Sequence, residues 1–349
     1  MTTLLELKQK VKFFFGTNQV FFMPILKFAI AFLHFIWLSE SMGYFPMLNN
    51  LPFLAVLAGI CCILPSQVTV LCSFVLMILH SYAVGLECAG FMIVLILLLA
   101  IFFLRFSGGT SFITVLTPIS FSVGFPVMLP IGSGLLLPAS SAIPAACGVV
   151  LYYFIRYLNA HASELSNVDI EPVAKLQTMA DGIIYNWGMW ITVVTFIAVI
   201  LMVNLIRTRS FDYAWRVSII VGGVLYVVLM MTGSYYLNAT VDVSYLITST
   251  VIAVVVGIVI EFFFFGGDYS RTERLEYEDD EYYYYVKAVP KASVSTAKRR
   301  IKKIHVEDLP QSGRSGEVFN PYAHPLFSSD DPEADLNLEK KLEESLRDL

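Results

Sequence analysis

The sequence predicts an all-α polytopic membrane protein with about eight transmembrane helices, a re-entrant hairpin broken by proline and glycine, and a small cytoplasmic C-terminal tail. The first observation behind this class is composition, because 57% of the 349 residues are hydrophobic and only 15% are charged. In soluble domains about 25% of residues are charged. The mean hydropathy is +0.70. The second observation is distribution, since long apolar runs fill residues 20–266 and most charges lie in residues 267–349.

Residues 1–19 are predicted to form an amphipathic cytoplasmic segment, followed by the transmembrane domain at 20–266. In the N-terminal segment, leucine and phenylalanine side chains are interspersed with Lys8, Lys10 and Lys12. This pattern suits a helix that lies on an anionic bilayer surface. The apolar run that follows lacks a cleavage site and is about as long as a spanning helix, so we interpret it as an uncleaved first span.

The first span, from about Val20 to Leu38, carries Lys27 and His34 seven residues apart and hence on one helix face. An ionisable residue inside a span indicates a functional site, so both are candidates for a solute path. Two plainer interpretations stay open. Lys27 is near enough to the cytoplasmic interface to extend its amine into water, and His34 is also compatible with a hydrogen-bonded packing role.

Seven further apolar runs are predicted to span the membrane. They are Leu51–Leu64, Val68–Tyr82, Cys88–Leu104, Ala139–Ile155, Trp187–Leu205, Arg216–Leu237 and Tyr245–Phe265. The first of these is short for a crossing unless Met47 and Leu48 join it, which would give about 17 residues, near the minimum length. Between the fourth and fifth, Arg156–Tyr185 is polar with apolar residues at helical spacing, which indicates an interfacial helix. Trp187 and Trp190 mark a membrane boundary, as aromatic belts do.

One further apolar region, Ser111–Leu137, cannot form a plain spanning helix. Pro118, Pro126 and Pro130 each end or kink a helix, and the backbone groups they free must find partners within the protein or in a water-filled cavity. Such interrupted segments point to transport sites. The hydroxylic residues in and beside it are candidates for the solute path: Thr117, Ser120, Ser122, Ser133, Ser140 and Ser141. The alternative interpretation is that the prolines merely kink packed helices.

The distribution of lysine and arginine predicts how the chain crosses the membrane. With the N-terminus inside, the basic residues near span ends divide seven to two between the cytoplasmic and outer sides. The cytoplasmic set is Lys8, Lys10, Lys12, Arg105, Arg207, Arg209 and Arg216, and the outer set is Arg156 and Lys175. The chain between Arg105 and Arg156 must then cross an odd number of times. We therefore expect Ser111–Leu137 to enter and return as a hairpin with its tip near Phe121–Val127, and both termini to be cytoplasmic.

Glu261 lies near the cytoplasmic end of the last span, where a buried carboxylate is unfavourable unless it is paired or protonated. The bilayer edge is about one helical turn away, so one interpretation is an interfacial residue that reaches water. The other is a cytoplasmic gate or an ion pair with an arginine of the Arg207–Arg216 loop, and Arg216 is the candidate partner.

Residues 267–349 are predicted to form a cytoplasmic tail with three elements that gain stability by docking. Tyr282, Tyr283, Tyr284 and Tyr285 favour a strand, which needs a second strand or a partner chain because one isolated strand is not stable. A basic cluster follows at 298–303, which suits either anionic lipid or a solvated face. Leu338, Leu342 and Leu346 form one stripe of a short terminal helix, which needs a surface to pack on. These elements point to a cytoplasmic protein partner.

No catalytic apparatus is visible in the sequence. It has no GxxxxGK[ST], HExxH, GxSxG or GxGxxG pattern, and its five cysteines, Cys61, Cys62, Cys72, Cys88 and Cys147, have no CxxC spacing. We therefore predict no enzyme activity, no cofactor, no metal site and no nucleic-acid partner. Any ATP-driven activity would need its nucleotidase on another chain.

Five segments carry a family resemblance: LKFAIAFLHFIW, GYFPMLNNLP, ACGVVLYYF, DYAWRVSIIVGG and DYSRTERLEYEDDEYYYYVKAVPK. With these segments the chain resembles an uncharacterised family of multi-pass, permease-like membrane proteins of Gram-positive bacteria. The resemblance covers most of residues 10–305, and its most specific part is the acidic, tyrosine-rich strand of the tail. It implies a location in the bacterial cytoplasmic membrane and assigns no functional residues.

Two functions follow as hypotheses. The first is a transporter-like or permease-like protein whose solute path is lined by the broken hairpin together with Lys27 and His34. The second, from a different class, is a membrane scaffold or regulatory protein that recruits cytoplasmic partners through residues 267–349.

Overall fold

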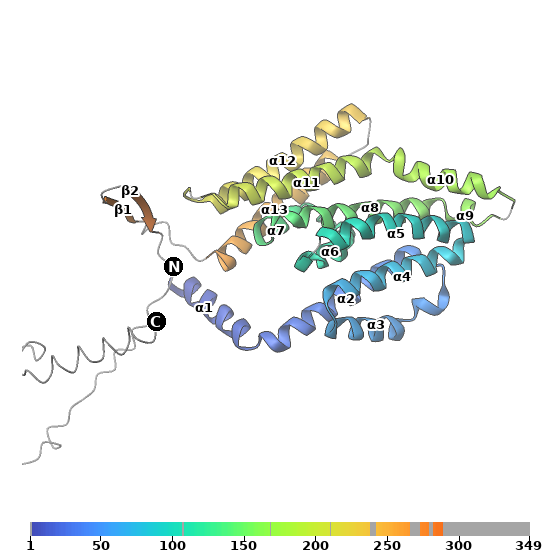
Figure 1. Ribbon diagram of the computed structural model, residues 1–349, viewed down its shortest axis with the longest axis horizontal. Helices are drawn as coiled ribbons and strands as arrows, with labels where there is room; N and C mark the ends of the chain where they lie inside the picture. Colours follow the sequence, from blue (N-terminus) through green and yellow to red (C-terminus); the bar gives the residue numbers. More distant parts are fainter. Residues whose placement is uncertain are drawn as a thin grey trace, which may run out of the picture. The chain divides into compact units, whose positions relative to one another are not determined.

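The structure is a computed structural model that describes residues 2–106, 108–167, 169–209, 211–237, 242–265, 273–278 and 282–288. The α-helices are α1 (Thr2–Thr17), α2 (Gln19–Met42), α3 (Leu51–Ile63), α4 (Ser66–Val84), α5 (Leu86–Phe106), α6 (Phe112–Ser122), α7 (Met128–Leu136), α8 (Ala142–Ala160), α9 (Ala162–Leu165), α10 (Pro172–Ile184), α11 (Trp187–Arg207), α12 (Ala214–Leu237) and α13 (Val243–Phe264) (Figure 1). Short 3-10 turns lie at Pro46–Asn49, Gly108–Thr110 and Ala139–Ser141. The strands are β1 (Glu273–Glu278) and β2 (Tyr283–Ala288).

Six of the described helices are long and apolar enough, by length and composition, to cross a membrane: α2, α4, α11, α12, α13 and the unit formed by Ala139–Ser141 and α8. Large apolar side chains remain exposed around them, for example Val194, Ile220 and Val251. A helix that is apolar both inside and outside a bundle is typical of a membrane span. The predicted class of all-α polytopic membrane protein is therefore confirmed.

Helix α3 agrees with the predicted run Leu51–Leu64 to within one residue, and Met47 and Leu48 do not extend it, because Pro46–Asn49 forms a 3-10 turn before it. One other element differs in extent from the prediction. The predicted interfacial helix at Arg156–Tyr185 is divided among the end of α8, the single turn α9, and α10, which begins at Pro172. Proline suits a first helical position because its missing N–H would have no partner there.

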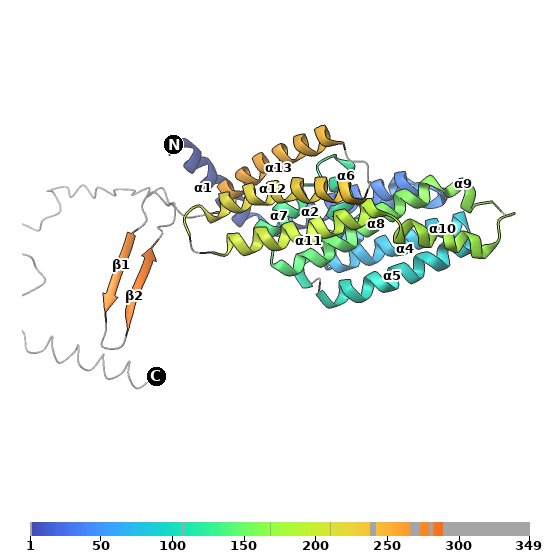
Figure 2. The same cartoon turned by 90° about the horizontal axis from the view of Figure 1, so that it is seen from above.

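The bundle has two apolar cores that share α8. One joins α2, α3, α4 and α5 to one face of α8, and the other joins α7, α11, α12 and α13 to another face. The short helices α6 and α7 lie between the two groups, since α6 packs on α2 and α8 while α7 packs on α11 and α13 (Figures 1 and 2). This placement packs the proline-broken segment against helices of both groups, while Val123, Met128 and Leu136 remain exposed.

Glycines allow close approach between the helices of the second core. The side chains of Val203 and Ile191 on α11 pack over Gly222 and Gly233 on α12, and Ile219 on α12 packs over Gly257 on α13. Small residues at such contacts are typical of membrane helix pairs, where van der Waals packing drives association.

The described part of the tail is a two-stranded antiparallel sheet in which Leu275 pairs with Val286 and Tyr277 with Tyr284. The tyrosine strand therefore pairs with a second strand of the same chain. Two parts of the predicted tail, the basic cluster at 298–303 and the helix carrying Leu338, Leu342 and Leu346, lie outside the described residues.

Candidate functional site

The segment 112–136 forms two antiparallel helices, α6 and α7, joined by a turn at 123–127, and we call it the α6–α7 hairpin. Gly124 has φ +86, a conformation that favours glycine. Its carbonyl accepts a hydrogen bond of 2.7 Å from the hydroxyl of Tyr245 on α13. The amide of Phe125 donates to the carbonyl of Ser120 at 3.0 Å. The broken backbone of the turn thus finds its partners inside the protein.

The far end of the hairpin is capped by two side chains of α11. Asn204 donates from Nδ2 to the carbonyl of Leu137 at 2.8 Å, and Arg207 donates to the carbonyls of Leu135 and Leu137. The Arg207 guanidinium also lies 5.7 Å from the centre of the Trp215 ring. The last carbonyls of a helix have no partner within the helix. Asn204 and Arg207 supply that partner for the short helix α7.

Aromatic rings hold the hairpin near its turn. The ring of Phe121, at the end of α6, stacks on Tyr152 at 4.4 Å and on Phe196 at 5.7 Å between ring centres, and it meets Tyr153 edge-on at 5.9 Å. The Tyr153 hydroxyl lies 3.0 Å from Oγ1 of Thr192. Helices α8 and α11 therefore hold the tip of the hairpin through ring contacts, which add to simple apolar burial.

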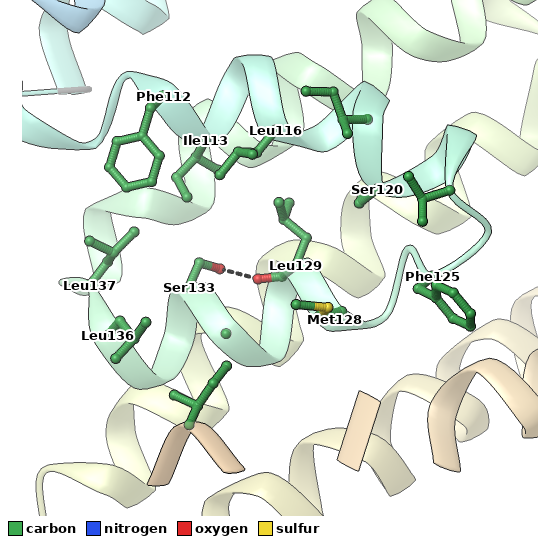
Figure 3. Close-up of a pocket in the computed structure, with 14 residues that line it drawn as sticks. Phe112, Ile113, Leu116, Ser120, Phe125, Met128, Leu129, Ser133, Leu136 and Leu137 are labelled. Carbon is green, nitrogen blue, oxygen red and sulfur yellow. Dashed lines mark hydrogen bonds between the residues drawn. The ribbon is translucent and has the colours of Figure 1, made fainter. Parts of the chain in front are cut away.

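A cavity of about 420 Å³ lies between α6 and α7 (Figure 3). In Figure 3, Ile113 and Leu116 of α6 face Leu129 and Ser133 of α7 across it. Its lining is Phe112, Ile113, Leu116, Ile119, Ser120, Val123, Phe125, Met128, Leu129, Gly132, Ser133, Leu136, Leu137 and Ile260. The volume falls in the range of roughly 300–1,000 Å³ that is typical of ligand pockets. The hairpin therefore combines a broken backbone with a space large enough for a ligand.

The two hydroxyls in this lining are turned toward their own helices. Ser120 donates to the carbonyl of Thr117 at 2.7 Å, and Ser133 donates to the carbonyl of Leu129 at 2.7 Å. Such back-bonding is common for serine in helices. The cavity consequently presents an apolar surface.

The other residues predicted to line a solute path do not join this cavity. Lys27 is exposed on α2, and Ser122 and Ser140 are exposed as well. Thr117 is buried and donates to the carbonyl of Ile113 at 2.8 Å. Ser141 is buried, and its hydroxyl has no hydrogen-bond partner among the described residues. Of the eight residues predicted for the path, the structure thus brings only Ser120 and Ser133 together at the cavity.

His34 is buried in the first core rather than at the cavity. Its ring lies 5.7 Å from that of Trp37 and 6.1 Å from that of Phe35, measured between centres. The ring is close to the backbone of Val115, yet neither nitrogen makes a hydrogen bond of ordinary geometry among the described residues. Its surroundings are those of an apolar packing residue.

Glu261 forms an ion pair with Arg216 at the same end of the bundle as Arg207. Nε of Arg216 lies 3.1 Å from Oε1 of Glu261, and the side chains are 60% and 7% exposed respectively. The second oxygen, Oε2, is buried without a hydrogen-bond partner in the described part of the chain. Glu261 was interpreted either as an interfacial residue that reaches water or as a gate or partner of an arginine, and the structure contains the ion pair with Arg216.

Lys8 of α1 reaches the same end of α13. Its Nζ donates to the carbonyl of Phe265 and lies 5.1 Å from the centre of the Phe262 ring. Burial, and then the nearby charge of Lys12, lower the pKa of the Lys8 amine, while the carboxylate of Glu261 acts in the opposite direction. These contacts attach the N-terminal helix to the last spanning helix.

Four residues of this region were not predicted from the sequence as site residues: Asn204, Arg207, Tyr245 and Ile260. The charge of Arg207 served only to predict the orientation of the chain. A signal for Asn204 exists in the sequence, because an amide within an otherwise apolar span must find a polar partner. Arg207, Tyr245 and Ile260 join the site only because elements far apart in the sequence pack together, and no sequence pattern marks them.

The fold and the site define the class as a multi-pass helical membrane protein with an apolar cavity at a broken helical hairpin. Comparisons with protein-family models, with curated proteins and with solved structures find no match for this chain. Among the described residues, no group of three or more His, Cys, Asp or Glu residues could hold a metal ion.

Proposed function

We propose that this chain is a transporter-like or permease-like membrane protein that binds an apolar or amphiphilic solute at the α6–α7 hairpin. The observation that carries the proposal is the cavity between two half-helices whose ends are held by Asn204, Arg207 and Tyr245. Interrupted helices at membrane depth are typical of transport sites, since irregular backbone is tolerated there only when it is buried or lines a cavity.

The proposal includes a finer topology. Eight spans cross the membrane, the α6–α7 hairpin enters and returns from the cytoplasmic side, and both termini are cytoplasmic. The caps support this arrangement, because Arg207, at the end of α11, lies against the end of the hairpin near Leu137. The family resemblance adds the bacterial cytoplasmic membrane as the location.

Transport is tested with membrane vesicles that contain the wild-type chain and a panel of labelled amphiphilic and hydrophilic solutes. Met128 lies at the rim of the cavity and is 43% exposed, so Met128→Trp should obstruct entry. The matched control is Ile93→Trp on α5, at a site 42% exposed and outside the cavity. We expect protein-dependent movement of amphiphilic solutes that Met128→Trp lowers and Ile93→Trp preserves. Movement of hydrophilic solutes alone would contradict the proposal.

A second candidate function is a membrane scaffold that recruits a cytoplasmic partner through the tail. The observation in its favour is the β1–β2 sheet, because a two-stranded sheet is marginal by itself and the side chains of Leu275, Tyr283 and Val286 are exposed. Deletion of residues 268–349 separates the two functions. Loss of a crosslinked partner with unchanged solute movement favours the scaffold, whereas unchanged recovery of the partner counts against it.

A further inference from the structure

We propose that the cavity of the α6–α7 hairpin holds an acyl chain of a membrane phospholipid. This inference rests on the proposed function in one respect, the placement of the hairpin at membrane depth. It narrows the apolar or amphiphilic ligand of the transport proposal to one class, the acyl chain of a phospholipid.

The chemistry of the lining selects a hydrocarbon chain. Among the described lining residues, only Ser120 and Ser133 carry polar side-chain atoms, and both hydroxyls donate to carbonyls of their own helix. A polar solute would lose hydrogen bonds to water without gaining replacements here, which is unfavourable. A hydrocarbon chain has no such bonds to lose, and its burial against leucine, isoleucine and phenylalanine side chains is favourable.

The rim of the cavity faces the outside of the bundle. Val123, Met128 and Leu136 line the cavity and are also exposed. On a membrane-spanning protein such a surface meets lipid tails, so a phospholipid chain can enter sideways without leaving the bilayer. Phospholipid is also the most abundant hydrocarbon at that depth, which is why we name it rather than a rarer apolar molecule.

A glycine makes the space available. Gly132 lines the cavity, and a Cβ added there would meet no heavy atom within 4 Å. The Cβ of a larger side chain at this position therefore meets open space, and we expect the rest of that side chain to occupy cavity volume. Gly132→Leu provides a direct competitor for the chain, and leucine is also a better helix former than glycine.

The matched control is another helical glycine with open space. Gly90 on α5 is exposed and lies outside the cavity, and a Cβ added there would likewise meet no heavy atom within 4 Å. Gly90→Leu adds the same side chain to the outer surface of the bundle. Met128→Trp, at the rim, is a second variant that blocks the cavity by a different route.

The experiment uses the full chain in phospholipid vesicles that contain a phosphatidylcholine with a photoactivatable group on one acyl chain. After illumination, labelled peptides are quantified by mass spectrometry, without any gradient or transported solute. We expect label on residues 112–137, reduced by roughly tenfold in Gly132→Leu because most contacts of the chain are replaced. Label in Gly90→Leu should match the wild type, and Met128→Trp should resemble Gly132→Leu.

Several outcomes overturn the inference. Equal labelling of 112–137 in the wild type, Gly132→Leu and Met128→Trp would show contact with the surface only. Labelling by a photoactivatable free fatty acid, but not by the phospholipid, would assign the cavity to another ligand, and a crosslink to a second copy of the chain would assign it to an interface. The labelling experiment does not depend on transport. If residues 112–137 are labelled but no solute moves, the lipid site is supported and the transport proposal is contradicted. If solute moves but these residues are not labelled, only the lipid site is contradicted.

Discussion

Two glycines of α7, Gly132 and Gly134, differ in the space beside them. At Gly132 there is open space, whereas at Gly134 a Cβ would lie 2.8 Å from Cβ of Val203 and 3.2 Å from the carbonyl oxygen of Ile200. We expect Gly132→Ala to stabilise the fold by about 0.5–1 kcal/mol through helix propensity. Gly134→Ala should destabilise it by roughly 1–3 kcal/mol, because the contact between α7 and α11 must open.

The measurement is the fraction of monodisperse protein that survives heating in detergent, followed by size-exclusion chromatography. The two alanine variants act as controls for each other, since they change the same helix by the same group. Shifts of the same sign would mean that the space beside Gly132 is not open or that α11 does not press on Gly134.

At the same scale, the ion pair between Glu261 and Arg216 predicts thermodynamic coupling. Arg216 is 60% exposed, so solvent weakens the attraction, and a coupling of about 0.5–1 kcal/mol is reasonable for such a pair. Glu261→Gln should lower stability in detergent, and adding Arg216→Gln should cause little further loss. A double-mutant cycle measures the coupling. Strictly additive losses would show that the two side chains do not stabilise each other.

At the scale of the element, α7 depends on the side chains that cap its last carbonyls. Arg207→Gln and Asn204→Ala each remove one of two donors to the carbonyl of Leu137, and Arg207→Gln also removes the donor to the carbonyl of Leu135. Each lost hydrogen bond costs about 0.5–1.5 kcal/mol, and the double variant costs more because it removes both donors from the Leu137 carbonyl. We expect each variant to lower the thermal stability of the protein in detergent. The combined loss should be non-additive, because both side chains serve one carbonyl.

Arg209→Gln is the control for the cap, because Arg209 is an exposed arginine two residues beyond Arg207. It removes the same charge from the same end of α11 and should leave stability within about 0.5 kcal/mol of the wild type. If Arg209→Gln is as damaging as Arg207→Gln, the effect belongs to charge at the end of the span and not to the cap of α7.

The position of the α6–α7 hairpin could be predicted from the sequence, but the apolar character of its cavity was not. Of the three prolines expected to break the segment, only Pro126 lies in the turn at 123–127, which agrees with the tip expected near Phe121–Val127. Pro118 lies inside α6 and Pro130 in the first turn of α7. Ser133 was predicted to contact a solute, yet in a helix its hydroxyl bonds to the carbonyl four residues earlier. Back-bonding is a local preference and could have been foreseen.

The caps of the hairpin could not be foreseen in the same way. Asn204 and Arg207 are about 70 residues from Leu137 in the sequence, and only the packing of α11 on α7 brings them together. The cavity has the same origin, since its lining joins α6 and α7 to Ile260 of α13. Apolar periodicity predicts which segments are helices, whereas these contacts depend on how the helices are arranged.

At the scale of the whole molecule, the distribution of lysine and arginine predicts the orientation of the chain in the membrane. Helix ends that contact each other must also lie on the same side of the membrane. The Arg207 end of α11 contacts Leu137, the Arg216 end of α12 contacts Glu261, and Lys8 contacts Phe265. These contacts gather basic residues at one end of the bundle, which the positive-inside rule assigns to the cytoplasm.

Cysteine labelling in intact cells tests this orientation. In a variant without the five native cysteines, one cysteine is introduced either at Ser166, beyond α9, or at Thr208, beyond α11, both of which are exposed. We expect a membrane-impermeant maleimide to modify the cysteine at 166 in intact cells, and to modify the cysteine at 208 only after permeabilisation. A permeant maleimide that labels both positions is the control for reactivity. Because one inversion of the bundle exchanges the two positions, the reverse pattern would place Lys8, Arg207 and Arg216 outside, and would overturn the cytoplasmic entry proposed for the α6–α7 hairpin.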